Sequence, residues 1–152
     1  MSDEESAVVL DRSAIDEVLG TGGVGVLALA DDNEPYAIPI SYGYDGDAGE
    51  VYLRLGFGED SEKRRFLNSS DGVALVVSNE SDEGWVSVVV RGPLTDVPEA
   101  SIDGAVVDSI RAIDIPFFTV YDEDPRELAY DLYRLTPETI TGRREKPSVG
   151  IE

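Results

Sequence analysis

Three stretches with strand-like composition follow one another early in the chain, and only short polar turns separate them. Residues 24–30 and 35–44 are joined by residues 31–34, and residues 50–55 follow the glycine- and aspartate-rich turn at 45–49. Turns this short reverse the chain and join antiparallel neighbours, whereas parallel strands need a crossover of a dozen or more residues. This part of the chain is therefore expected to form an antiparallel sheet.

The rest of the chain repeats the pattern of short apolar stretches bounded by turn residues. Further strands are predicted at residues 8–10, 72–78, 85–91, 130–135 and 138–142, and residues 94–97 are expected to continue the 85–91 strand past a bulge. Helices are predicted at residues 13–19, from residue 60 or 61 to 68, and at 99–113. Many short strands and three helices predict a mainly β fold, an antiparallel barrel with peripheral helices. A length of 152 residues suits one domain, residues 1–152, with a tail at 146–152 that we expect to be mobile.

Two local patterns predict where the first helix starts and ends and how one strand is buried. Residues 13–16 resemble a capping box with aspartate in place of glutamate, which places the helix start at Ser13, and Gly20 is expected to end that helix. Residues 24–30 are small and apolar on both faces, which is typical of a strand buried on both sides.

The charge composition narrows the classes of function. Against 32 acidic residues stand 12 basic ones, a formal net charge of −20, and such a field repels nucleic acid and anionic lipid. The carboxylates are spread along the chain, which favours a solvated surface adapted to high salt.

The chain has no cysteine and no histidine, so thiolate chemistry, serine–histidine hydrolysis and histidine-ligated metal or haem are excluded. No long apolar run is present, and we expect a soluble, cytoplasmic protein.

Cations and glycines gather in one stretch of this acidic chain. The stretch contains Arg54, Gly56, Gly58, Lys63, Arg64 and Arg65. Alternation in residues 51–55 turns Val51, Leu53 and Leu55 toward the core and Tyr52 and Arg54 to the opposite face. A strand arginine beside a helix start can bind a phosphate, and flexible glycines let the backbone approach it. The alternative is that Lys63 and Arg64 form ordinary helix-surface pairs with Glu59 and Asp60, and Arg64 and Arg65 are interpreted as surface or interface residues.

Over residues 12–143, the order of segments resembles the FMN-binding split barrel of the pyridoxamine 5′-phosphate oxidase family, and more closely its short nitroimidazole-reductase-like branch. Four pieces carry the resemblance: residues 25–40 (GVLALADDNEPYAIPI), residues 52–56 (YLRLG) with the later 61–63 (SEK), residues 68–77 (NSSDGVALVV) and residues 85–94 (WVSVVVRGPL). The resemblance implies a six-stranded antiparallel split β-barrel.

The resemblance also implies a cofactor site. The FMN phosphate would be held by Arg54, Ser61 and Lys63, and the ring would lie along the strand at residues 39–42, where backbone amides and Ser41 address its polar edge. The implied cofactor-binding residues are Pro39, Ile40, Ser41, Tyr42, Arg54, Leu55, Gly56, Ser61 and Lys63. No catalytic side chain is implied.

Members of the family are generally homodimers with the flavin at the interface, and Trp85, Arg143 and Arg144 are the candidates for contributions from a second subunit. The chain departs from the family pattern in two ways: the stretch between Arg54 and Ser61 carries extra residues, and Arg54 replaces a histidine of the branch. Without histidine, true pyridoxamine phosphate oxidase activity is not expected.

The resemblance favours an FMN-dependent oxidoreductase that passes hydride or electrons from a small reduced donor to a small oxidised acceptor. Two alternatives stay open: a non-catalytic flavin-binding protein for storage or sensing, and a relative that uses a deazaflavin.

Overall fold

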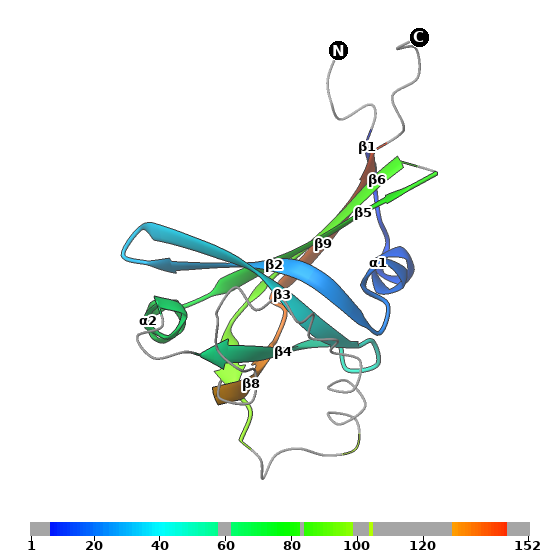
Figure 1. Cartoon of the computed structure of the whole chain (residues 1–152). Coiled ribbons are helices and arrows are strands. Elements are labelled where there is room, and N and C mark those ends of the chain that lie inside the picture. The colour runs from blue at the N-terminus through cyan, green and yellow to red at the C-terminus, as the bar shows by residue number, and fades with distance from the viewer. Residues whose placement is uncertain (1–6, 58–61, 83, 99–103, 105–128, 146–152) are drawn as a thin grey trace.

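The computed structural model describes residues 7–57, 62–82, 84–98, 104 and 129–145, and one curled antiparallel sheet dominates this part of the chain (Figure 1). Its strands are β1 (Ala7–Val9), β2 (Gly22–Asp31), β3 (Glu34–Asp45), β4 (Glu50–Phe57), β5 (Val73–Ser81), β6 (Gly84–Gly92), β7 (Leu94–Asp96), β8 (Ala129–Leu135) and β9 (Thr139–Glu145). Among the described residues, helices α1 (Arg12–Leu19) and α2 (Glu62–Ser69) are defined. Across the sheet the order is β1-β9-β6-β5-β2-β3-β4-β8-β7, and every pairing is antiparallel.

The prediction of a mainly β, antiparallel split-barrel fold is confirmed. The described sheet carries nine strands where six were expected, partly because β1 and β7, of three residues each, extend its two edges. The helix predicted at residues 99–113 lies outside the described residues except for Gly104, and so does the tail at 146–152.

One strand prediction was wrong. Residues 94–97 do not continue β6; the chain leaves that ladder and forms β7, which pairs with β8 at the far edge of the sheet. At the crossing, the amide of Glu138 donates to the carbonyl oxygen of Arg91 (2.7 Å) and that of Thr136 to Pro93 (3.2 Å). A Cβ on Gly92 would collide with the Thr136 carbonyl oxygen, so glycine lets the two segments pass side by side.

Helix α1 begins earlier than predicted. Its N-cap is Asp11, whose carboxylate accepts a hydrogen bond from the amide of Ala14 at 2.8 Å, while Ser13 lies inside the first turn. Asp11 has the extended backbone that a cap requires, so it replaces Ser13 in this role. Gly20 ends the helix as expected, with φ of 61°.

The core fills the inner, concave side of the sheet. In β4, Val51, Leu53 and Leu55 belong to the buried core cluster as predicted, and Arg54 is exposed on the opposite face. Tyr52 is also buried, at 2% exposure, but lies outside that cluster. The prediction for β2 was wrong, since only one of its faces is buried: Leu27 is fully buried, whereas Val24 and Val26 are 59% and 42% exposed. The outer face of β2 is thus apolar but open to solvent.

Candidate functional site

The second half of β3 contains four of the residues predicted to bind the cofactor, and its two sides differ. Ile40 and Tyr42 face the core and are 8% and 1% exposed. Pro39 and Ser41 alternate with them and face the outer side, opposite Val26 and Val24 of β2. Only Pro39 and Ser41 therefore present side chains on the outer face, and the other two could meet a ligand there only through their backbone.

Tyr42 is fixed by its own hydrogen bond. Its hydroxyl donates to the carbonyl oxygen of Leu19, at the end of α1, at 3.0 Å. Burial raises the pKa of Tyr42 to about 12, so the phenol keeps its proton at neutral pH. Its side chain has a structural role that ties β3 to α1.

Ser41 is the unusual member of this group. Its side chain is 5% exposed, and its Oγ atom has no hydrogen-bond partner. A buried hydroxyl without a partner costs free energy, and most buried polar atoms in proteins are satisfied. The Oγ atom thus retains an unused donor and acceptor on the strand where the flavin ring was expected.

The pairing of β3 with β4 stops beside this position. The last described pair is Tyr42 with Leu53, so from Ile40 toward Pro35 the described residues of β3 pair with β2 alone. Proline is tolerated where one side of a strand is open, because it has no N–H to donate. This explains Pro39 within a strand that is otherwise central in the sheet.

The residues of β4 predicted to bind the cofactor also lie on two different faces of the sheet. Arg54 is exposed on the outer face, opposite Leu132 of β8, whereas Leu55 is 1% exposed and faces the core. The next residue, Gly56, pairs with Tyr130. If the β3–β4 register of Tyr42 with Leu53 were extended by one residue, Arg54 would lie opposite Ser41, on the same face.

Two predicted residues cannot be placed against this group. Lys63 lies in the first turn of α2, but its side chain is not among those described, and Ser61 lies outside the described residues. The structure therefore places Ser41 and Arg54 on the same face of neighbouring strands and leaves the contribution of α2 open.

A polar cluster that the sequence did not reveal lies next to Arg54 on the same side of β4. The hydroxyl of Tyr52 donates to a carboxylate oxygen of Glu50 (3.0 Å), and Nε of Arg134 lies 3.2 Å from the same oxygen. The Arg134 guanidinium also stands over the Tyr52 ring, 5.4 Å from its centroid. Arg134 thus compensates the Glu50 carboxylate, which reduces its repulsion of an anion near Arg54.

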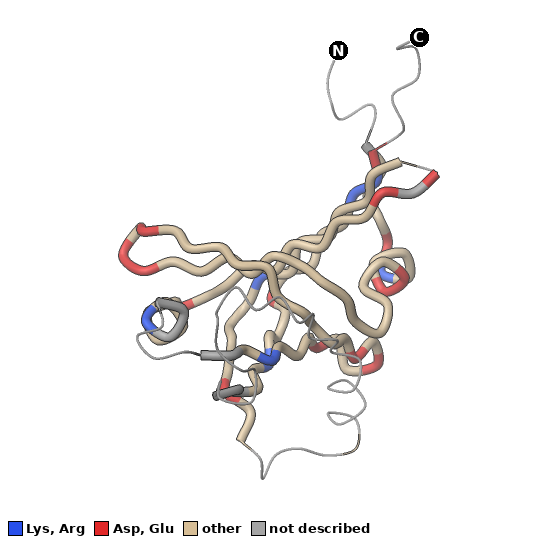
Figure 2. The backbone as a smooth tube through the Cα atoms, viewed as in Figure 1, with Lys and Arg blue, Asp and Glu red and all other residues tan. Residues whose placement is uncertain are grey.

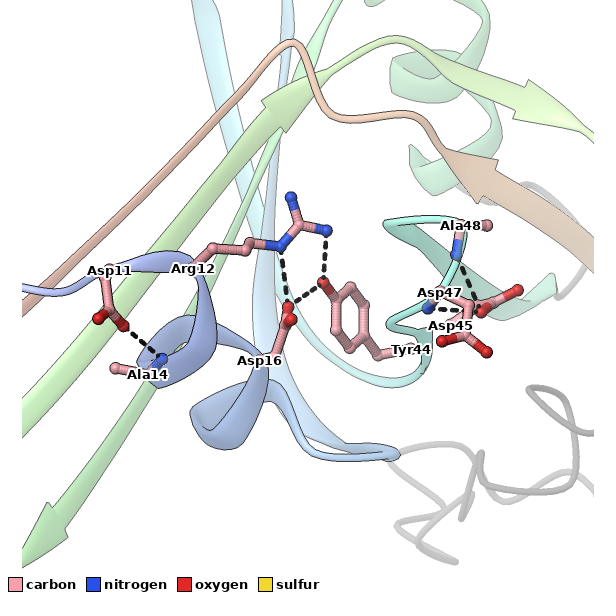
Figure 3. A network of polar contacts seen from close by, with 8 residues as sticks. All are labelled: Asp11, Arg12, Ala14, Asp16, Tyr44, Asp45, Asp47 and Ala48. Carbon is pink, nitrogen blue, oxygen red and sulfur yellow. Dashed lines mark hydrogen bonds and ion pairs between the residues drawn. The ribbon is translucent and has the colours of Figure 1, made fainter.

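A second cluster connects α1 to β3 (Figure 3). The Tyr44 hydroxyl donates to Asp16 at 2.6 Å, and Arg12 donates through Nε to Asp16 (3.0 Å) and through a terminal nitrogen to the Tyr44 oxygen (3.2 Å). The Tyr44 hydrogen bond, supported by Arg12, lowers the pKa of the Asp16 carboxyl. The contact with Asp16 in turn raises the pKa of Arg12.

Arg12 also borders a pocket of about 490 Å³, which none of the predicted cofactor residues that the structure describes lines. Its lining residues are Leu10, Arg12, Ile15, Ala48, Gly49, Pro137, Glu138 and Ile140. Among the described residues, no group of three or more acidic side chains could hold a metal ion. No helix in the described part of the chain is long and apolar enough to cross a membrane.

Comparison with known proteins gives one curated relative and several solved structures. An uncharacterized protein of Rhizobium meliloti is 30% identical over 91 residues, which span 59% of this chain and 57% of that protein. An FAD-binding protein from Mesorhizobium loti is 25% identical, with a TM-score of 0.68 over 93% of this chain and 98% of its own.

A third similar protein is from Bacteroides thetaiotaomicron and is proposed to confer 5-nitroimidazole antibiotic resistance. It is 18% identical, with a TM-score of 0.66 over 90% of this chain and 86% of its own, a likeness that concerns the fold alone. The family model for pyridoxamine 5′-phosphate oxidase matches residues 11–144, which contain the β3 and β4 site residues and nearly all of the sheet. This chain belongs to the pyridoxamine 5′-phosphate oxidase family.

Proposed function

We propose that this protein binds FMN on the outer face of β3 and β4 and acts as an oxidoreductase, passing hydride or electrons from a small reduced donor to a small oxidised acceptor. The observation that carries the proposal is the buried Oγ of Ser41, which has no partner and lies on the same face as Arg54. Family membership and the similar FAD-binding protein of Mesorhizobium loti support a flavin as the ligand.

The proposed roles follow from the faces of the two strands. Arg54 would hold the phosphate through charge-assisted hydrogen bonds, each worth about 1.5–3 kcal/mol. Ser41 would hydrogen-bond the polar edge of the ring, while Pro39 would cover the ring with apolar atoms. Ile40, Tyr42 and Leu55 would contribute backbone only, because their side chains are buried in the core. Gly56 lets the backbone approach closely, and Lys63 and Ser61 remain proposed ligands from α2 and the residues before it.

The bound flavin would supply the redox chemistry through its ring, and the protein supplies position and electrostatics. FMN rather than FAD is our proposal, because Arg54, Ser61 and Lys63 are assigned to one terminal phosphate. The mass of the cofactor released from purified protein distinguishes the two. A deazaflavin would be recognised by its different absorption spectrum.

The outer face of the sheet supports the expected homodimer. Val26 pairs with Pro39 on one side and Val76 on the other, and Val76 pairs with Val89, which makes an apolar row across four strands. Val24, Val26 and Val76 are 59%, 42% and 37% exposed. Acidic residues gather instead at hairpin ends, where Figure 2 shows them.

A protein with a net charge of −20 repels its own copies unless the contact avoids the carboxylates. The apolar row does so, and a second copy presents the same acid-free row, as a two-fold interface requires. We therefore propose that this face forms the homodimer interface, with the flavin site on β3 at its border. Trp85 and Arg143 lie on this outer face, so their proposed roles in a second copy belong to this proposal, whereas Arg144 pairs with Val8 and Val86 on the opposite face and is not part of it.

A matched pair of variants tests the interface. Val26→Glu should convert the dimer into a monomer in analytical ultracentrifugation, because it places a charge in the apolar row. Val8→Glu is the control, since Val8 has similar exposure (43%) but faces away from this row in β1. A monomeric wild type, or a Val26→Glu variant that remains dimeric, would contradict this interface.

The catalytic part of the proposal needs a separate experiment. The flavin-loaded protein is reduced with NADH or NADPH without oxygen and is then mixed with a quinone, a nitro compound or oxygen. Reduction followed by repeated reoxidation by an acceptor supports an oxidoreductase. A bound flavin that goes through no such cycle indicates a storage or sensing protein.

The cytoplasmic location expected from the sequence stays a prediction, which cell fractionation would check.

A further inference from the structure

Arg65 of α2 contacts the acidic end of the β2–β3 hairpin. A terminal nitrogen of its guanidinium donates to Glu34 at 3.3 Å, and Nε lies 3.7 Å from a carboxylate oxygen of Asp31. The sequence had suggested only a surface or interface residue here. The side chain is 49% exposed, yet it bridges two carboxylates on a different element.

The same guanidinium also packs on the neighbouring aromatic residue. Its central carbon lies 4.5 Å from the centroid of the Phe66 ring, within the range of a cation–π contact. Phe66 is 1% exposed, and Tyr36 of β3 stacks on it with ring centroids 4.7 Å apart and an angle of 7° between the planes. Arg65 is therefore held by two carboxylates and an aromatic stack, all connected to the β2–β3 hairpin.

The end of α2 is fixed to the same hairpin. Ser70, just after the helix, has its Oγ 2.7 Å from the carbonyl oxygen of Phe66 and 2.9 Å from that of Ala30 in β2. The same Oγ accepts a hydrogen bond from the amide of Ala30 at 3.1 Å. This anchor and the buried Phe66 ring fix where the helix ends and which side of it faces the hairpin, while its first turn depends on further contacts.

Arg65 supplies such a contact. In an α-helix, positions two residues apart differ by about 200° around the axis, so position 63 lies on nearly the opposite side of α2 from position 65. Holding Arg65 against the hairpin thus fixes the direction in which position 63 faces. We propose that Arg65 is a positioning residue that orients the start of α2 for binding the phosphate of the cofactor; this rests on the proposed function.

The test compares two ligands that differ only in the phosphate. Flavin fluorescence titrations of the cofactor-free protein give the Kd of FMN and of riboflavin for wild type, Arg65→Ala and Arg91→Ala. Arg65→Ala should weaken FMN binding about three- to tenfold, because the exposed ion pairs and the cation–π contact that it removes are individually weak. Riboflavin binding should be unchanged. Arg91→Ala, an exposed arginine on β6, should change neither value.

Salt gives a second readout. Since the ion pairs are exposed, the loss of FMN affinity in Arg65→Ala should be larger at about 0.1 M salt than at about 1 M, where charges are screened within a few ångströms. Arg65→Lys keeps the positive charge but lacks the planar fork and its stacking, so it should restore part of the affinity.

The outcomes separate the two proposals. Wild-type protein that binds FMN no more tightly than riboflavin would show that the proposed phosphate site itself is wrong. A clear preference for FMN that Arg65→Ala leaves intact would overturn the positioning role alone. Equal losses for FMN and riboflavin would also overturn it, because they would indicate general damage to the fold rather than a misplaced phosphate ligand.

Discussion

Ser41→Ala should have opposite effects on the cofactor-free protein and on cofactor binding. In the free protein the Oγ of Ser41 is buried without a partner, and leaving such a group unsatisfied costs about 1–3 kcal/mol. Alanine removes this cost and fits the same space. We expect the free energy of unfolding of the cofactor-free variant to rise by about 1 kcal/mol, the lower end of that range.

Cofactor binding should weaken in the same variant. Binding gives the wild-type hydroxyl a partner and removes its penalty, and alanine has no penalty to remove. A difference of about 1.4 kcal/mol corresponds to a tenfold change, so we expect the Kd of FMN to rise about tenfold. Urea unfolding of the cofactor-free protein measures the first effect, and flavin fluorescence titration measures the second.

Ser70→Ala is the contrasting control. The Ser70 hydroxyl is satisfied, with oxygen and nitrogen partners at 2.7–3.1 Å, so its loss should lower the free energy of unfolding by about 1 kcal/mol. If Ser41→Ala instead destabilises the cofactor-free protein and leaves FMN affinity unchanged, the Ser41 hydroxyl does not contact the cofactor.

Four further predictions concern stability. Tyr42→Phe should lower the free energy of unfolding by about 1–2 kcal/mol in urea, because the buried carbonyl of Leu19 loses its donor; an unchanged midpoint would contradict this. Gly92→Ala should destabilise the fold by more than about 2 kcal/mol, since its Cβ would meet the Thr136 carbonyl, and an alanine variant as stable as wild type would show that the crossing can relax. Asp16 has a folded pKa below its ordinary value of 3.8, so its contribution to stability is present above that pH and is lost as the pH falls through the folded pKa. Asp16→Asn should therefore flatten the acid-unfolding curve below pH 3.8, and an identical curve would refute the role of this carboxylate. Finally, the thermal midpoint should rise between about 0.1 M and 1 M potassium chloride as self-repulsion is screened, and a falling midpoint would contradict a salt-adapted surface.

The parts of the fold that depend on local periodicity could be predicted from the sequence. Alternation alone assigned Leu53 and Leu55 to the core and Arg54 to the opposite face, because side chains in a strand alternate strictly. The same reasoning failed for Val24 and Val26. An apolar strand face has the same sequence pattern whether the core covers it or it lies open on the surface, as Val24 and Val26 do.

The contacts that depend on the order of strands could not be predicted. Glu50 and Arg134 are far apart in the sequence and meet only because β4 pairs with β8. Arg65 and Glu34 likewise meet because α2 lies against the β2–β3 hairpin. The start of α1 could not be predicted from the sequence either. Asp11 and Ser13 are both good N-cap residues, and the backbone conformation decides between them.

The central claim is that Arg54, on the outer face of β4, holds the anionic end of a flavin cofactor. The most direct test is calorimetric titration of wild type and Arg54→Ala with FMN and with riboflavin. The variant is expected to lose about ten- to a hundredfold in FMN affinity, the value of one charge-assisted hydrogen bond, and to retain its riboflavin affinity. Equal FMN affinity in the two proteins, or an equal loss for both ligands, would contradict it.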